Sequence, residues 1–455
     1  MRWRASGLAG TLGVRRSPLR WPESAHAFSR GSPAREAHAM TDFEALYSPA
    51  ARRLKPSIIR SLLSLVREPG VISLAGGTPD SNLFDLELYS RIAAQVTRDE
   101  GRFCLQSGET QGSLPLREEI CRYLDGRGLK VGPDQVLITN GSQQGIDLLC
   151  RLFLGPGDCL AMEEPGYLGA INGFRNLGAD ILPLPLDDGE GLDPRAVDAA
   201  LRSWTRAKPK LLYLTPTFQN PTGRCLGPAR RAALADLAAR HGLLLVEDDP
   251  YGEICFDGPP PTPICASDRG TNSLFLGSFS KMSVPGLRLG WAAGPAAVIR
   301  SMTLAKESAD ICTNVLAQAI GAEFLRGGHL RATLPHLVDA YRARRDVLHQ
   351  ALCNELPEGS RLERSGGGFF LWAELPEGYD TLALFQEAIA AKVAYVPGAP
   401  FYSTEGAGLR SMRLSFCAVE EPKLKEGARR LGELLNASRR RPSEPRQPQL
   451  TERIA

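Results

Sequence analysis

The chain has 455 residues, of which 43% are hydrophobic and 23% are charged, and its formal net charge is +3. This composition is typical of a soluble globular protein, and the length allows two packed lobes. The small net charge gives no reason to expect nucleic acid or a membrane surface as a partner, and no apolar run in the sequence is long enough to cross a bilayer.

Residues 1–40 are rich in Arg, Ser, Ala and Gly and poor in acidic residues. This pattern fits a mitochondrial presequence, and it fits equally well upstream sequence that precedes a start at Met40. We expect residues 1–40 to be disordered and the protein to be cytoplasmic, or located in the mitochondrial matrix if the presequence is genuine. Residues 41–90 are expected to form an N-terminal segment that packs on a small domain and on a cleft.

Short apolar runs alternate with helical patterns in the middle of the chain. Between two of the runs, Pro228 and Gly242 mark the start and the end of one helix. Alternation of this kind predicts a mostly parallel sheet with helices on both faces, and so an α/β large domain over residues 91–329. The predicted strands are Gln135–Thr139, Leu160–Met162, Leu211–Leu214, Leu243–Val246 and Ser273–Leu276.

The pattern changes after about residue 330. A long helix is expected over Leu334–Leu356, followed by strands at Gly368–Glu374 and Met412–Phe416. These elements predict a smaller α+β domain over residues 330–437, and residues 438–455 have the composition of a disordered tail. A cleft between two lobes is a common place for a ligand.

The segment Leu276–Arg288 carries the strongest chemical signal. The amine of Lys281 can form an imine with an aldehyde cofactor, while Ser278, Ser280 and Arg288 can hold a phosphate on the same molecule. Taken alone, a lysine after Ser-Phe-Ser is better explained as a solvated loop residue.

Three other predicted strand ends carry matching groups. The segment Thr139–Gly145 resembles an anion cradle at the start of a helix, although a glycine-rich turn would read the same way. Thr215–Gly223 supplies Asn220, which could also be a turn residue before Pro221. In Val246–Tyr251, an aspartate at the end of an apolar strand needs a partner, which could be a helix cap, a salt bridge or a protonated pyridine nitrogen.

Together these segments resemble the fold-type-I, class I/II aminotransferases that use pyridoxal phosphate (PLP), and within them the α-aminoadipate/kynurenine aminotransferase branch. The resemblance extends over residues 57–435, and the spacing also fits, with 28 positions from Asn220 to Asp248, 33 on to Lys281 and 7 more to Arg288. The motifs that carry it are Asn220-Pro-Thr-Gly, Glu247-Asp-Asp-Pro-Tyr, Ser278-Phe-Ser-Lys with Gly286-Leu-Arg, and Arg413-Leu-Ser-Phe.

The resemblance implies a role for each matching residue. Lys281 would form the Schiff base and move the proton at the substrate Cα, and Asp248 would pair with the ring nitrogen. Asn220 and Tyr251 would bind the phenolic oxygen of the cofactor, and Tyr167 would stack on its ring. The residues implied for the phosphate are Ser142, Gln143, Ser278, Ser280 and Arg288. Arg413 would bind the substrate α-carboxylate, with Gly77 and Asn220 beside it.

Two positions bear on substrate and assembly. Arg60 aligns with a helix that reads the far end of the substrate in the aminoadipate branch, although a solvated arginine fits equally well. The family usually has a tyrosine where this chain has Ser107, and that tyrosine reaches the cofactor phosphate of the neighbouring subunit. We therefore expect a homodimer that acts on an L-amino acid and a 2-oxo acid, with 2-oxoglutarate/glutamate as one pair and no metal ion.

Two alternatives are open at this point. The same cofactor residues occur in carbon–sulfur β-lyases, because the chemistry up to the carbanion is shared. They also occur in PLP-binding effector domains of transcriptional regulators, which carry a winged-helix domain ahead of them. The residues before the region of resemblance do not read as such a domain.

Overall fold

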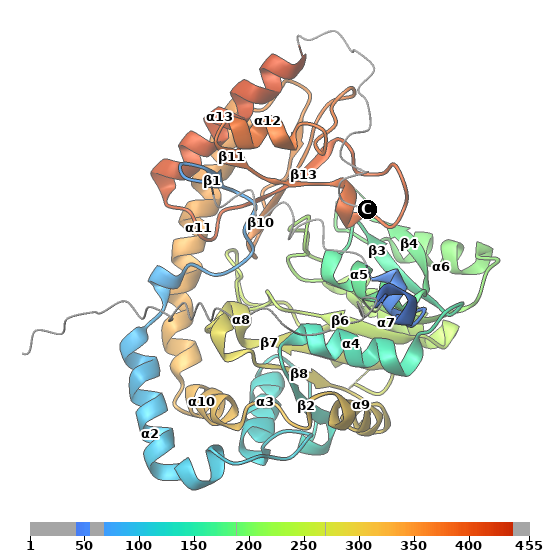
Figure 1. Ribbon diagram of the computed structural model, residues 1–455, viewed down its shortest axis with the longest axis vertical. Helices are drawn as coiled ribbons and strands as arrows, with labels where there is room; N and C mark the ends of the chain where they lie inside the picture. The colour runs from blue at the N-terminus through green and yellow to red at the C-terminus, as the bar shows by residue number, and fades with distance from the viewer. Residues whose placement is uncertain (1–41, 55–67, 188, 269, 440–455) are drawn as a thin grey trace, which may run out of the picture. The chain divides into compact units, whose positions relative to one another are not determined.

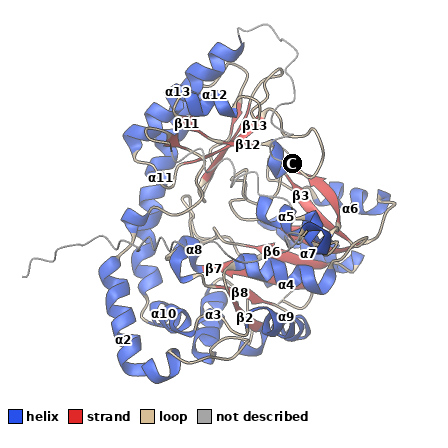
Figure 2. Ribbon diagram, in the orientation of Figure 1, coloured by secondary structure: helices blue, strands red, loops and turns tan. Residues whose placement is uncertain are grey.

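Seven strands between residues 136 and 293 form one sheet (Figure 2). Their order in the sheet is β2-β8-β7-β6-β5-β3-β4. All neighbouring pairs are parallel except those of β8, which runs antiparallel to β2 and β7. The computed structural model describes residues 42–54, 68–187, 189–268 and 270–439. The strands are β2 (Val136–Thr139), β3 (Cys159–Glu164), β4 (Asp180–Pro185), β5 (Pro209–Leu214), β6 (Leu244–Asp248), β7 (Ser273–Ser278) and β8 (Gly290–Ala293).

Helices cover both faces of this sheet (Figure 1). In β5, Leu211 and Tyr213 pack with the helices on one face, and Leu212 and Leu214 pack with those on the other. The first face is covered by α4 (Ser142–Phe153), α5 (Leu168–Leu177) and α9 (Ala296–Asp310). The other is covered by α3 (Leu114–Gly126), α6 (Pro194–Ser203), α7 (Pro228–His241) and α10 (Val315–Arg326), and α2 (Leu86–Cys104) packs against α10.

The five strands predicted for the large sheet are all present, and α7 has the predicted bounds. Gly242 caps α7 in the left-handed conformation, with φ of +66°. Two strands were missed. β4 contains two prolines, which are tolerated because it lies at the edge of the sheet, and β8 is a short Gly-Trp-Ala-Ala run.

A second, antiparallel sheet of four strands is built from the C-terminal part, in the order β12-β13-β10-β9. Two long helices, α11 (His329–Glu355) and α13 (Glu421–Arg439), lie side by side against this sheet and share one apolar core with it (Figure 1). β1 (Ile72–Ser73) pairs in parallel with β11 (Val393–Ala394) beside this core. The other elements are β9 (Arg361–Leu362), β10 (Phe370–Glu374), α12 (Phe385–Ala390), β12 (Val396–Pro397) and β13 (Ser411–Ser415).

The fold class is therefore the predicted one, an α/β part with a mostly parallel sheet and a smaller α+β part. Tyr47 and the residues after it form one unit, and the short 3-10 helix Glu44–Leu46 belongs to a separate one. Two elements cross the expected boundaries: α2 spans position 90, and α13 continues to Arg439. Residues 1–40 and the rest of the expected tail lie outside the described residues.

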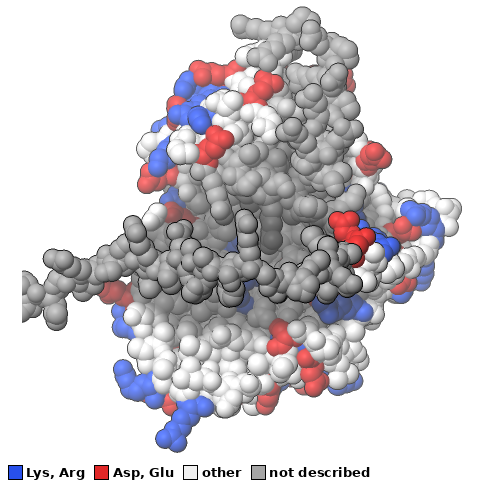
Figure 3. All heavy atoms as spheres, in the orientation of Figure 1, with Lys and Arg blue, Asp and Glu red and all other residues white. Residues whose placement is uncertain are grey.

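The described surface carries both signs of charge. On the face drawn in Figure 3, Lys and Arg side chains lie next to Asp and Glu side chains at the upper left and at the right edge. Of the described helices, none combines the length and apolarity that a bilayer crossing requires.

Candidate active site

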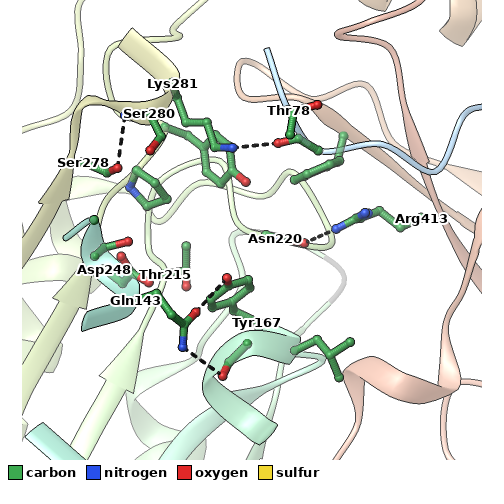
Figure 4. Close-up of a pocket in the computed structure, with 18 of the residues that line it drawn as sticks. Thr78, Gln143, Tyr167, Thr215, Asn220, Asp248, Ser278, Ser280, Lys281 and Arg413 are labelled. Atoms are coloured by element: carbon green, nitrogen blue, oxygen red, sulfur yellow. Dashed lines mark hydrogen bonds between the residues drawn. The ribbon is translucent and has the colours of Figure 1, made fainter. Parts of the chain in front are cut away.

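A cavity of about 370 Å³ lies where the parallel strands of the large sheet end (Figure 4). Loops after β2, β3, β5, β6 and β7 reach it from one side, and β10 and β13 reach it from the other. Ligand sites of open parallel sheets commonly occupy this position. The lining includes Ala75, Gly77, Thr78, Gly141, Ser142, Gln143, Tyr167, Leu168, Asn172, Thr215, Asn220, Asp248, Tyr251, Ser278, Ser280, Lys281, Arg288, Phe370, Phe401 and Arg413.

Lys281 enters the cavity from α8 (Phe279–Met282), a single turn that directly follows β7. The hydroxyl of Ser278 caps this turn by accepting a hydrogen bond from the Ser280 amide at 3.1 Å. The Lys281 ammonium donates to the carbonyl of Gly77 at 2.7 Å, so a group from the N-terminal part orients it. Burial lowers the pKa of Lys281 from 10.5 to about 8, which makes the neutral, nucleophilic amine accessible near neutral pH.

Asp248 ends β6 and is only 2% exposed. Its Oδ2 accepts a hydrogen bond of 2.6 Å from the hydroxyl of Tyr213, whereas Oδ1 has no partner among the described residues. Burial raises the pKa of Asp248 to about 7, against the opposing effect of the Tyr213 hydrogen bond. A buried carboxylate oxygen without a partner is costly, and a cationic group in the cavity would remove that cost.

An anion cradle lies at the start of α4. Gly141 precedes the helix with φ of +76°, and the first amides of a helix have no intrahelical acceptor. A Cβ at Gly141 would lie 2.8 Å from Nη2 of Arg288, and a Cβ at Gly290 would lie 2.7 Å from the amide nitrogen of Ser142. Because Gly141 and Gly290 have no side chains, the start of β8 and the Arg288 guanidinium can both lie close to the start of α4.

Tyr167 and Gln143 form the wall next to this cradle. The Tyr167 hydroxyl donates to Oε1 of Gln143 at 3.0 Å, and Gln143 donates onward to the carbonyl of Gly169 at 3.3 Å (Figure 4). Burial raises the pKa of Tyr167 to about 12, so its hydroxyl stays protonated at neutral pH. The centre of the Tyr251 ring lies 6.0 Å from the Lys281 ammonium.

Arg413 faces these groups from β13. Its Nη1 donates to Oδ1 of Asn220 at 2.9 Å, and its Nη2 donates to the carbonyl of Ala75 at 2.9 Å. The guanidinium lies 4.1 Å from the ring centre of Phe370 and 5.3 Å from that of Phe401. Burial lowers the pKa of Arg413 to about 10, and the side chain is still cationic at neutral pH. A buried cation next to an open cavity can bind a carboxylate.

The structure brings together the residues that the sequence singled out, with two exceptions. Arg60 lies outside the described residues; each of the others proposed for the cofactor or the substrate, from Gly77 to Arg413, lines the cavity, and Ser107, where the family usually has a tyrosine, is exposed outside it. Sequence reasoning missed the apolar wall of Leu168, Phe370 and Phe401, whose residue types give no signal apart from core packing. It also missed Tyr213, although a tyrosine within a fully buried strand needs a partner for its hydroxyl.

The chain is similar to known proteins in sequence and in fold. The family model "Aminotransferase class I and II" matches residues 70–431. An aromatic-amino-acid aminotransferase of Thermococcus litoralis is 38% identical, over 87% of this chain and 95% of its own length. A 2-aminoadipate transaminase of Thermus thermophilus is 37% identical, over 86% and 96%. The crystal structure of a Pyrococcus horikoshii kynurenine aminotransferase superimposes with a TM-score of 0.84 at 38% identity, covering 87% of this chain and 98% of that one.

The chain therefore belongs to the class I and II aminotransferases, and it is an enzyme that uses PLP. The described residues fit this cofactor. The unpartnered Oδ1 of Asp248 suits a protonated ring nitrogen, the glycine-lined cradle with Arg288 suits a phosphate, and Lys281 suits an aldehyde. Among the described residues, no group of three or more His, Cys, Asp or Glu side chains is placed to hold a metal ion.

Proposed function

We propose that this chain transfers an amino group between an L-amino acid and a 2-oxo acid, with Lys281 as the residue that binds the cofactor covalently. The observation that carries the proposal is the joint placement of four groups around one cavity: the Lys281 amine, the unpartnered Asp248 oxygen, the Arg288 cradle and the Arg413 guanidinium. When bound, PLP supplies an electron-poor ring that stabilises negative charge at the substrate Cα.

The residues proposed for the cofactor form groups, according to the part of the cofactor that each would hold. Asp248 would keep the ring nitrogen protonated, and Asn220 and Tyr251 would bind the phenolic oxygen. Tyr167 would lie against the ring face. The phosphate would be held by Ser142, Gln143, Ser278, Ser280 and Arg288, which gather at the start of α4 and at the loop after β7. Lys281, once displaced by the substrate, would move the proton at Cα, and its lowered pKa favours that role.

The substrate carboxylate would bind Arg413, next to Asn220 and Gly77. Among the described residues, Nε of Arg413 is buried without a hydrogen-bond partner, so the guanidinium has donor capacity left for a carboxylate. Beyond it, Leu168, Phe370 and Phe401 form an apolar wall suited to a large side chain. We propose glutamate and 2-oxoglutarate as one pair and a broad second partner, which agrees with the aromatic and aminoadipate substrates in the names of the two relatives. Arg60 stays our proposal for a distal carboxylate.

We also propose that the enzyme is a cytoplasmic homodimer. Phe103, Leu105 and Ile311 are exposed by 60%, 68% and 64%. They belong to two segments that approach each other at Gly108 and Val315, where a Cβ on Gly108 would lie 2.8 Å from Cγ2 of Val315. Exposed apolar side chains gathered on one face mark an interface. Light scattering should give twice the chain mass. A mass of one chain, with cofactor bound and activity retained, would contradict the dimer.

A donor screen tests the reaction type. Each amino acid is added to the purified holoenzyme while the visible absorbance of the cofactor is followed, and 2-oxoglutarate is then added. We expect the absorbance to change with glutamate and with an aromatic or aminoadipate donor, and to return with the 2-oxo acid. Lys281→Ala should abolish the cycle. Release of pyruvate or sulfide without that cycle would instead identify a β-lyase.

A further inference from the structure

Tyr213 is joined directly to Asp248 at the bottom of the cavity. Tyr213 is 1% exposed, and its hydroxyl donates a hydrogen bond of 2.6 Å to Oδ2 of Asp248. Tyr213 pairs with Val246 across β5 and β6, and Asp248 follows Val246 by two positions, so the alternation of side chains puts Tyr213 and Asp248 on the same face of the sheet. The contact therefore follows from the register of two central strands.

The phenol ring is fixed from the other side as well. Phe174 of α5 packs edge-on against it, with ring centres 5.6 Å apart and an interplanar angle of 75°. Burial, and then the negative charge of Asp248, raise the pKa of Tyr213 well above its usual value, so its hydroxyl is a donor over the whole working pH range. Tyr213 thus presents one proton to one oxygen of Asp248.

This arrangement leaves the two oxygens of Asp248 in different situations. Oδ2 accepts a hydrogen bond from Tyr213, whereas Oδ1 accepts none from any described residue. The Asp248 side chain lines the cavity. Hydrogen bonding to the charged form of a carboxyl favours that form. The Tyr213 hydroxyl therefore opposes the tendency of the buried Asp248 to take up a proton.

We propose that Tyr213 is a positioning residue for the reaction, which turns Oδ1 of Asp248 toward the ring nitrogen of the cofactor and keeps the shared proton on that nitrogen rather than on the carboxyl. The inference rests on the proposed role of Asp248. A purely structural role, in which the phenol only fills the space between β5, β6 and α5, is the competing explanation.

Tyr213→Phe separates the two, because it keeps the ring and removes only the hydroxyl. The matched control is Tyr395→Phe: Tyr395 is fully buried, and its hydroxyl donates at 2.6 Å to the carbonyl of Thr381, outside the cavity lining. The first measurement is the pH midpoint at which the visible absorbance of the enzyme-bound cofactor changes. A protonated ring nitrogen would withdraw electrons and make Nζ of Lys281 less basic once that nitrogen is bonded to the cofactor.

We expect Tyr213→Phe to move that midpoint to higher pH and to lower kcat at least about tenfold, which is ~1.4 kcal/mol of transition-state stabilisation, with KM changed little. Tyr395→Phe should leave both unchanged. The inference is overturned if the two variants have the same midpoint and the same kcat. If wild-type enzyme fails to transaminate any donor, it is the proposed function that fails, and the midpoint shift still reports on Tyr213.

A second variant covers the case in which Tyr213→Phe does not fold. Incorporation of 3-fluorotyrosine at position 213 keeps the ring and the hydroxyl but makes the phenol a stronger donor. The absorbance midpoint should then move to lower pH, opposite to the effect of Tyr213→Phe. An unchanged midpoint in the fluorinated holoenzyme would show that the hydrogen bond does not act on the cofactor.

Discussion

The Nη1 of Arg413 donates to Oδ1 of Asn220 at 2.9 Å, although the two residues lie 193 positions apart and belong to different sheets. Asn220 follows β5 of the seven-stranded sheet, and Arg413 lies on β13 of the four-stranded one. The group proposed for the substrate carboxylate is thus held in place by a residue proposed for the cofactor. Binding a carboxylate at Arg413 places Cα next to the groups of the large sheet.

Replacing Arg413 by Lys tests this relationship. Lysine keeps the positive charge but loses the planar fork that can donate to Asn220, Ala75 and a carboxylate together. We expect kcat/KM to fall by about tenfold to a hundredfold, which corresponds to the ~1.5–3 kcal/mol of a hydrogen bond to a charged group. Steady-state kinetics with glutamate and 2-oxoglutarate measure it.

The control is Arg345→Lys, because Arg345 is also fully buried but does not line the cavity. It should affect stability more than kcat/KM. An Arg413→Lys enzyme with kcat/KM equal to that of the control would show that Arg413 does not bind the substrate.

The lowered pKa of Lys281 predicts how the protein without cofactor takes up PLP. Only the neutral amine attacks an aldehyde, and the neutral fraction rises as the pH increases through the pKa. Since burial lowers the pKa of Lys281 from 10.5 to about 8, the uptake rate should rise up to about pH 8 and level off above it. Stopped-flow absorbance after mixing with PLP gives this rate, and Lys281→Ala provides the background. A rate that still climbs steeply near pH 10 would contradict the shift.

Much of the site could be predicted because its residues lie at the ends of strands that are evident in the sequence. Asp248 is the last residue of a strand, Ser142 and Lys281 each come three positions after the end of one, and parallel strands bring such positions to one edge of a sheet. The helix over Pro228–His241 was predictable for a local reason as well, since a proline begins it and a glycine ends it.

Contacts that depend on the register between strands could not be predicted. Tyr213 reads as core in an apolar run, and nothing in the sequence tells that its hydroxyl meets Asp248 of β6 rather than a residue of β3 on the other side. Phe401 lies over Arg413 only because the loop after β12 turns back to β13. The edge strand β4 was missed because its two prolines argue against a strand.

A buried charge cluster supports the segment that carries Asp248 and Tyr251. Nη2 of Arg127 lies 3.0 Å from Asp249, whose side chain is fully buried, and Nη1 lies 3.2 Å from Glu253. Arg127→Ala leaves the Asp249 carboxylate buried without its partner, so we expect a loss of about 3–5 kcal/mol in the free energy of unfolding.

Urea unfolding of the holoenzyme measures this loss. The comparison is Arg151→Ala, which removes an exposed pair with Asp147 one helical turn away and should cost no more than ~0.5 kcal/mol. Equal losses in the two variants would mean that the Arg127 cluster contributes nothing beyond a surface ion pair.

Gly290→Ala tests the anion cradle without removing any of its polar groups. A Cβ at Gly290 would lie 2.6 Å from the carbonyl carbon of Gly141 and 2.7 Å from the amide nitrogen of Ser142, so β8 and the start of α4 must move apart. A displaced helix start weakens a phosphate contact, because its amides no longer point at the oxygens. The affinity for PLP should fall at least about tenfold, or ~1.4 kcal/mol, as measured by titration of the protein without cofactor. Gly286→Ala is the matched control, since a Cβ there meets nothing within 4 Å, and it should bind PLP like the wild type. If both variants bind PLP equally well, the phosphate is not held at the start of α4.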